Sequence, residues 1–74
     1  MDYKAIADQV GPRVGATQEW IFHVLREGII SAKLPGGMQL KQDEISAALN
    51  VSHIPVREAL RRLEAQGLVR IHPN

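Results

Sequence analysis

The residues best suited to chemistry lie in the segment VSHIPVREAL, residues 51 to 60. Ser52 stands where a helix would begin, and a helix N-terminus offers unpaired N–H donors and partial positive charge to a phosphate. Arg57, one turn further on, can make two parallel hydrogen bonds to O6 and N7 of guanine. An ion pair within the helix or a solvated charge is the alternative for Arg57, and a plain N-cap is the alternative for Ser52. The segment indicates a helix whose first turns bind nucleic acid.

Neighbouring side chains extend this candidate site, and each has a simpler explanation beside the functional one. His53 can donate to a base or a phosphate, or it is an ordinary surface histidine. Ile54 either packs on a thymine methyl group or tucks against the preceding helix. Arg61 and Arg62 lie where a recognition helix usually leaves the groove, so we expect contact with the DNA backbone or exposure to solvent. Lys33 and Lys41 are candidates for phosphate contact.

Sets of residues typical of enzymes or metal sites do not occur in the sequence. The chain has no cysteine, so it has neither a disulfide nor a thiolate metal ligand. Its three histidines, His23, His53 and His72, lack the spacing of metal ligands. Gly36 and Gly37 do not form a phosphate-binding motif. We therefore expect no enzyme activity, no metal and no cofactor.

The length of the chain, 74 residues, is that of one small domain. Such a domain buries only about 60% of the surface that its unfolded chain exposes, so its core must be small. No apolar run approaches the roughly 20 residues of a membrane span, and the N-terminus lacks the basic and apolar regions of a signal peptide. We expect a cytoplasmic protein with no membrane partner.

Charge is distributed unevenly along the chain. The net charge is only +1, but residues 53 to 74 carry four arginines against two glutamates. A local basic patch of this kind can attract nucleic acid even when the total charge is near zero. The alternative is a solvated helix face.

Apolar spacing predicts a first helix over residues 17 to 33, with Thr17 as N-cap and the sequence LPGG at residues 34 to 37 as its end. Gly28 in its middle weakens the helix locally or lets another backbone come close. Residues 1 to 15 contain Gly11, Pro12 and Gly15 without a sustained period. We predict a flexible arm there, in which YKAIADQV can form a short helical turn.

Two further helices are predicted in close succession. The first covers residues 42 to 50, with acidic residues in its first turn and Asn50 at a left-handed C-terminal position. The second covers residues 52 to 66 and ends at Gly67 in a Schellman motif. Two helices joined by a turn this short are the helix-turn-helix arrangement, in which the second helix enters a major groove.

A small β-wing is the last predicted element. Residues 68 to 71 show the alternation of a strand that can pair with residues 38 to 40. The expected fold class is therefore mainly α, a winged helix-turn-helix with three helices and a minimal, incomplete β-wing. The expected domain covers residues 16 to 74.

The stretch PGGMQLKQDEISAALNVSHIPVREALRRLEAQGLVRI resembles the DNA-binding domain of GntR-type bacterial transcription regulators. Their pattern includes PPG, an acidic helix, LGVSRTPVREAL, and RLEAEGLV before a β-wing. The resemblance covers roughly residues 20 to 74. The ending, Leu68 to Asn74, is similar to the branch with all-helical effector domains, the FCD-type and fatty-acid-responsive members. Pro73 and Asn74 would begin the wing tip.

The resemblance implies sequence-specific DNA binding, with residues 52 to 66 in the major groove and with Ser52 and Arg57 in contact with DNA. His53 stands where most members have a guanine-reading arginine. Ile54 replaces a threonine that often touches phosphate. Asp43 stands where some members have a DNA-contacting arginine, and we do not carry that role over. The DNA-binding residues expected are Ser52, His53, Ile54, Arg57, Arg61 and Lys41.

The resemblance also implies partners that lie beyond these residues. Members of the family form homodimers on double-stranded operators, here expected to be an inverted repeat, and a C-terminal domain binds a small-molecule effector. We expect the chain to be an N-terminal DNA-binding domain without that effector domain. The alternative is a winged-helix module that binds a protein, with Ile54 and Val51 as anchors inside a polar rim.

Overall fold

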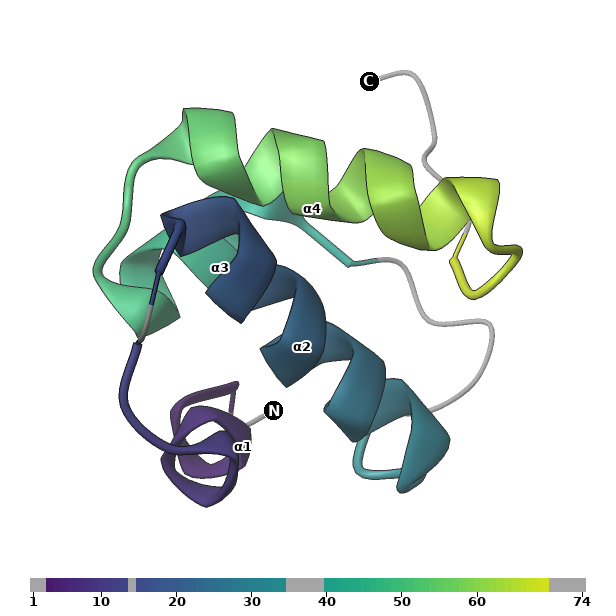
Figure 1. Cartoon of the computed structure of the whole chain (residues 1–74), viewed down its shortest axis with the longest axis horizontal. Helices are drawn as coiled ribbons and strands as arrows, with labels where there is room; N and C mark the ends of the chain where they lie inside the picture. The colour runs from purple at the N-terminus through teal and green to yellow at the C-terminus, as the bar shows by residue number, and fades with distance from the viewer. Residues whose placement is uncertain (1–2, 14, 35–39, 70–74) are drawn as a thin grey trace.

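The computed structural model describes residues 3–13, 15–34 and 40–69. Within these residues the chain forms four α-helices, α1 (Tyr3–Val10), α2 (Thr17–Ile30), α3 (Gln42–Leu49) and α4 (His53–Ala65). Figure 1 shows α4 along one edge of the molecule, with α2 crossing it and α3 behind. The mainly α helix-turn-helix fold class is confirmed, and the described part has one helix more than the sequence predicted.

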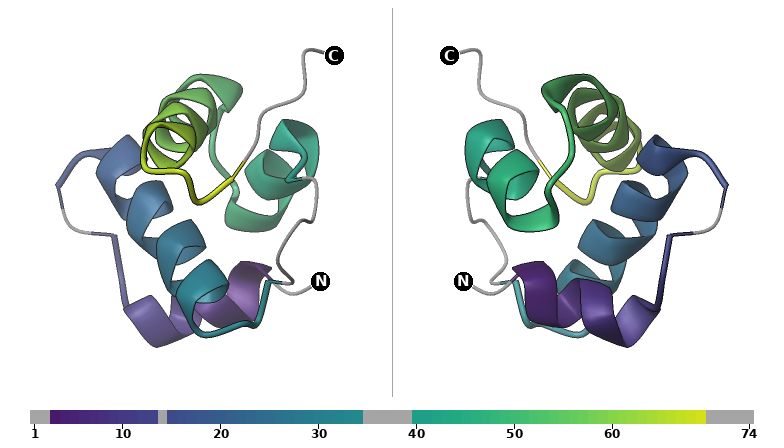
Figure 2. Two further views of the ribbon diagram at one scale, coloured as in Figure 1. Left: turned by 90° about the vertical axis from the view of Figure 1, so that its right-hand side faces the viewer. Right: turned by 90° about the vertical axis from the view of Figure 1, so that its left-hand side faces the viewer.

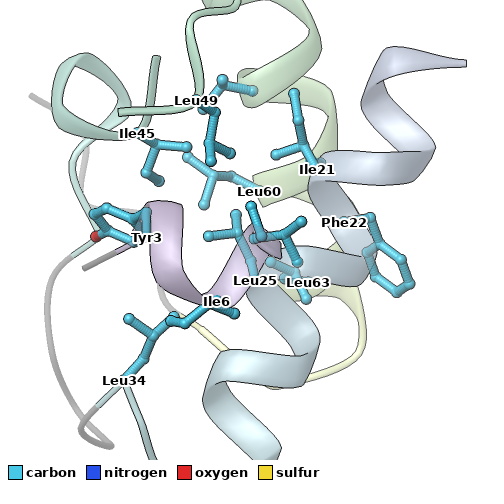
Figure 3. Close-up of a cluster of buried hydrophobic side chains, with 14 residues drawn as sticks. Tyr3, Ile6, Ile21, Phe22, Leu25, Leu34, Ile45, Leu49, Leu60 and Leu63 are labelled. Carbon is cyan, nitrogen blue, oxygen red and sulfur yellow. The ribbon is translucent and has the colours of Figure 1, made fainter. Parts of the chain in front are cut away.

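One hydrophobic core joins the four helices. Because α2 and α3 each pack against both α1 and α4, their apolar faces meet in a single cluster. Figure 3 shows this cluster, with Tyr3 and Ile6 of α1 among the side chains of the other helices. Its buried members are Tyr3, Ile6, Ala7, Ile21, Phe22, Val24, Leu25, Leu34, Ile45, Leu49, Val56, Ala59, Leu60 and Leu63.

Helix α1 is the main departure from the sequence prediction. Residues 3 to 10 form a helix instead of a flexible arm, because Tyr3, Ile6 and Ala7 share one face and are buried against α2 and α3. Figure 2 shows α1 lying across the C-terminal half of α2. A helix of eight residues is too short to be stable alone in water, so it is this packing that stabilises α1.

The segment after α1 is tied to α2. The indole Nε1–H of Trp20 donates to the backbone carbonyl of Gly11 at 3.1 Å. At the start of α2 the N-cap is Ala16, not Thr17 as predicted. The Thr17 hydroxyl instead accepts a hydrogen bond from Nη1 of Arg13 at 3.3 Å.

Helix α2 ends at Ile30, before the predicted end at residue 33. The backbone turns there through Ala32, which has a left-handed φ of 64°. This turn brings Leu34 back over the helix, where its N–H donates to the Gly28 carbonyl at 3.0 Å and its side chain is buried. Gly28 permits a close approach, but the groups that approach it are the side chains of Leu34 and Ile6, not another backbone as one of the two alternatives predicted.

The turn between α3 and α4 agrees with the prediction. Asn50 is left-handed, with φ 56° and ψ 51°, and its N–H donates to the Ser46 carbonyl. The N–H of Val51 donates to the same carbonyl at 3.1 Å. Because only Val51 and Ser52 follow before α4 begins, the second helix leaves sharply from the first.

The end of α4 is the predicted Schellman motif. Gly67 has φ 75°, its N–H donates to the Glu64 carbonyl at 2.9 Å, and the N–H of Leu68 donates to the Leu63 carbonyl at 2.9 Å. The predicted pairing of residues 38 to 40 with residues 68 to 71, and the wing tip at Pro73 and Asn74, lie for the most part outside the described residues. Leu40, Leu68 and Val69, which are described, pack against the core.

Candidate nucleic-acid interface

Helix α4 has one buried side and one exposed basic stripe. Val56, Leu60 and Leu63 are buried, and at about 100° per residue they define the side that faces the core. The exposed residues His53, Arg57 and Arg61 follow one another at intervals of four, so they line up along the helix. We call these three residues the basic stripe.

Arg62 does not belong to this stripe. Its Nη1 lies 2.6 Å from Oε2 of Glu19 on α2, and its guanidinium carbon lies 4.0 Å from the centroid of the Phe22 ring. The expectation that Arg62 is a merely solvated charge is therefore wrong, whereas its contact with the DNA backbone stays a prediction. Its charge is used to hold α4 against α2, and Glu19, 43 residues away in sequence, gave no local sign of this pairing.

The N-terminus of α4 keeps its polar groups exposed. Ser52 is the N-cap by position, with φ −75° and ψ 168°, but its side chain makes no capping hydrogen bond. The residue is exposed, and the first N–H groups of this helix of 13 residues have no acceptor within the helix. Such an end suits an anionic group.

The two arginines of the basic stripe differ in their surroundings. Arg57 is exposed, and its side chain makes no hydrogen bond or ion pair with another residue in the described part of the chain. The alternative of an ion pair within the helix is therefore not realised for Arg57. Arg61 lies 3.7 Å from Glu58, with 65% of its side chain exposed, and an ion pair this open contributes little to stability.

Ile54 projects from the first turn of α4 and is 69% exposed. The alternative in which Ile54 tucks against the preceding helix is therefore wrong. A large aliphatic side chain remains in water beside the basic stripe, where it costs free energy until something apolar covers it.

His53 has a partner that the sequence analysis did not anticipate. Its Nε2 lies 3.3 Å from Oδ1 of Asp43 in the first turn of α3. Both side chains are open to solvent, 54% for His53 and 87% for Asp43. The pair joins the starts of the two helices of the helix-turn-helix, and an approach between residues on different helices has no signature in local spacing.

The two lysines considered in the sequence are placed differently. Lys41 is the N-cap of α3 and is exposed. Lys33 lies beyond the C-terminal end of α2 and donates a hydrogen bond to the side chain of Gln9 in α1. Only Lys41 therefore lies on an element of the helix-turn-helix.

Other kinds of site were sought in the same residues. Among residues 3–13, 15–34 and 40–69 there is no group of three or more histidine, cysteine, aspartate or glutamate side chains able to hold a metal ion. Over the same residues, no helix combines the length and the apolar character needed to cross a bilayer.

A short helix, a left-handed turn, and a second helix with an open N-terminus and a basic stripe together define a helix-turn-helix DNA-binding domain. Residues 17–74 match the family described as bacterial regulatory proteins, gntR family. The chain belongs to this family and has its helix-turn-helix DNA-binding domain. The family is one of regulators, which does not favour the protein-binding alternative.

Similar proteins carry consistent names. The chain is 35% identical over 68 residues to the HTH-type transcriptional repressor RspR of Escherichia coli K12, covering 92% of this chain and 29% of RspR. It is 42% identical over 52 residues to an HTH-type regulator from the TAR-I ttuE-ttuC' intergenic region of Agrobacterium vitis, covering 70% of this chain and 30% of that protein. No solved structure is significantly similar to the chain. The chain thus spans less than a third of these relatives.

Proposed function

We propose that α4 reads DNA with the residues of its first two turns. In this arrangement Ser52 and the N–H groups at the helix start bind a phosphate, and Lys41 binds a second phosphate from α3. Arg57, with His53 and Ile54, contacts base edges in the major groove, and Arg61 contacts the DNA backbone where the helix leaves the groove.

The observation that supports this proposal best is the state of Arg57. It is exposed, without a partner in the described residues, one turn from an uncapped helix start. Holding a guanidinium there brings no ion pair to the folded chain, whereas guanine offers the two acceptors that it fits. The 69% exposed Ile54 beside it suits a thymine methyl group, which would remove this aliphatic side chain from water.

The wider assembly is part of the same proposal. Since the chain spans 29% of RspR, dimerisation and effector binding are assigned to a region outside these 74 residues. A homodimer would place two copies of α4 in successive major grooves of an inverted repeat. Cytoplasmic localisation and the likeness to the FCD-type branch remain predictions.

Titration of the chain with a short mixed-sequence DNA duplex tests the proposal by backbone amide NMR. We expect shifts concentrated from Ser52 to Arg61 that fade as salt rises, because binding releases counterions with a slope of about −0.9 per phosphate neutralised. Arg57→Ala should weaken binding by about 1 to 3 kcal/mol, and Arg26→Ala, which removes the same charge from an exposed site on α2, by much less. Silence of the segment at excess duplex, or equal effects of the two substitutions, would refute it.

A further inference from the structure

We propose that Asp43 is a specificity-determining residue of the DNA interface, acting through His53. The proposal rests on the proposed function, because it concerns what α4 presents to a base. It starts from the approach of Asp43 Oδ1 to His53 Nε2 at 3.3 Å across the helix-turn-helix. Asp43 itself belongs to α3 and needs no direct contact with DNA for this role.

The carboxylate decides which ring nitrogen of His53 carries hydrogen. A neutral imidazole has one N–H donor and one unprotonated acceptor nitrogen, whereas an ionised carboxylate only accepts. With Oδ1 facing Nε2, the hydrogen is favoured on Nε2, and Nδ1 becomes the acceptor. Water weakens this preference in the exposed pair, and the exclusion of water at a DNA interface strengthens it.

An acceptor nitrogen selects a different base from the one an arginine selects. In the major groove guanine shows the acceptors O6 and N7, whereas cytosine and adenine show amino groups. A His53 held with Nδ1 unprotonated pairs with an amino group and is repelled by guanine. Asp43 thereby gives His53 a preference for cytosine or adenine over guanine.

The chain offers a matched control for this role. Glu44 follows Asp43 in the first turn of α3 and is also exposed. Asp43→Ala and Glu44→Ala therefore remove the same charge from the same DNA-facing end and the same helix turn. A simple gain in DNA affinity from lost repulsion should appear in both variants, whereas a change in base preference should appear only in the first.

The test is selection of bound duplexes from a randomised pool by the 74-residue chain, at low salt and about pH 8, on the alkaline side of the range in which histidines titrate. The base pair read by His53 is the one whose preference disappears in His53→Ala. There the unchanged chain should favour cytosine or adenine over guanine about fivefold, the ratio that one hydrogen bond of ordinary strength provides. In Asp43→Ala the preference should fall to about twofold or less, with Glu44→Ala unchanged.

A second measurement reports on the ring directly. The nitrogen chemical shifts of the His53 imidazole should show hydrogen on Nε2 in the unchanged chain and a mixture of the two neutral forms in Asp43→Ala. The circular dichroism spectrum of Asp43→Ala should match that of the unchanged chain, because the 87% exposed Asp43 side chain supports no packing.

The outcomes separate the two proposals. If the chain binds duplexes and Asp43→Ala leaves the base preference and the imidazole shifts unchanged, the role of Asp43 is refuted and the proposed function stands. If Asp43→Ala removes a base preference only at a base pair where His53→Ala leaves it intact, the carboxylate reads the base directly and the route through His53 is refuted. If the chain binds no duplex with dependence on salt, the proposed function fails and the role of Asp43 fails with it.

Discussion

Replacing Gly28 by alanine should destabilise the protein, although alanine is the better helix former. A Cβ atom at this position would lie 2.7 Å from Cδ1 and 2.8 Å from Cγ of Leu34, and 3.0 Å from Cδ1 of Ile6. Both neighbours are buried, with exposed fractions of 1% for Leu34 and 3% for Ile6. The Leu34 backbone is also tied to the Gly28 carbonyl at 3.0 Å, so the side chain cannot simply withdraw.

Two opposing effects set the size of the loss. Alanine in a helix interior gains about 1 kcal/mol over glycine. Forcing an extra carbon into a packed core costs about 1 to 3 kcal/mol. We expect a net loss of about 1 kcal/mol, which lowers the Tm of a domain of this size by about 4 to 8 °C.

Thermal and urea unfolding followed by circular dichroism measures this effect, and Leu34→Ala supplies the matched background. Once the Leu34 side chain is shortened, the two closest contacts disappear and the gain in helix propensity remains. Gly28→Ala should therefore stabilise the Leu34→Ala variant and destabilise the unchanged chain. A higher Tm for Gly28→Ala in the unchanged chain would refute the reasoning, since Leu34 would then not be confined against the helix.

Three further predictions concern the other packed elements. Ile6→Ala should lower the free energy of unfolding, measured with urea, by about 2 to 5 kcal/mol because Ile6 is buried. Lys4→Ala, on the exposed side of α1, should change it by less than about 0.5 kcal/mol. Similar values for the two variants would contradict a packed α1. Burial and, secondarily, the Glu44 carboxylate raise the pKa of the Tyr3 phenol above 10.0, so stability is intact below pH 10.0 and falls as pH rises beyond it. Tyr3→Phe should reduce this loss of stability at alkaline pH, measured by denaturant titrations at several pH values. A free energy of unfolding that falls with pH as steeply as in the unchanged chain would contradict the role of Tyr3. Arg62→Ala should lower the Tm more than Arg61→Ala, and the reverse order would contradict the anchoring of α4 to α2.

The second and third helices of the sequence prediction were recovered almost to the residue because their signals are local. Acidic residues begin α3, Asn50 and Gly67 have the left-handed backbone that their residue types favour, and the apolar spacing of α4 marks its buried side. Each signal lies within a few residues of the feature that it marks, so no knowledge of tertiary contacts was required.

Helix α1 and the end of α2 were missed because tertiary packing decides both. A stretch of eight residues followed by Gly11 carries little periodic signal, and α1 depends on burying Tyr3 and Ile6 against other helices. Ala32 adopts a left-handed backbone that alanine seldom takes, because the turn returns Leu34 to the core. Neither choice follows from the propensities of the residues concerned.

The features of the candidate site also divide into those marked by local sequence signals and those decided by tertiary packing. Residue type and helical spacing were enough to nominate Ser52, Arg57 and Ile54, and the structure shows all three exposed at the start of α4. The pairings of side chains were out of reach, because Arg62 meets Glu19 and His53 meets Asp43 only after the helices pack. Sequence patterns identify which groups are available, whereas the fold decides which of them are already engaged.

The arrangement of the helices links the packing of α1 to the proposed DNA interface. Within the described residues, α1 packs on α2 and α3, and α4 packs on the same two helices, so the four helices form a closed ring of contacts. In this ring α1 lies opposite α4 and joins the side of α3 to that of α2. Loosening α1 therefore leaves α3 held mainly by α4 and by the short turn between them, and the spacing of Asp43 and His53 depends on that pair of helices. The helix farthest in sequence from the candidate site thus supports the geometry with which the site would meet DNA.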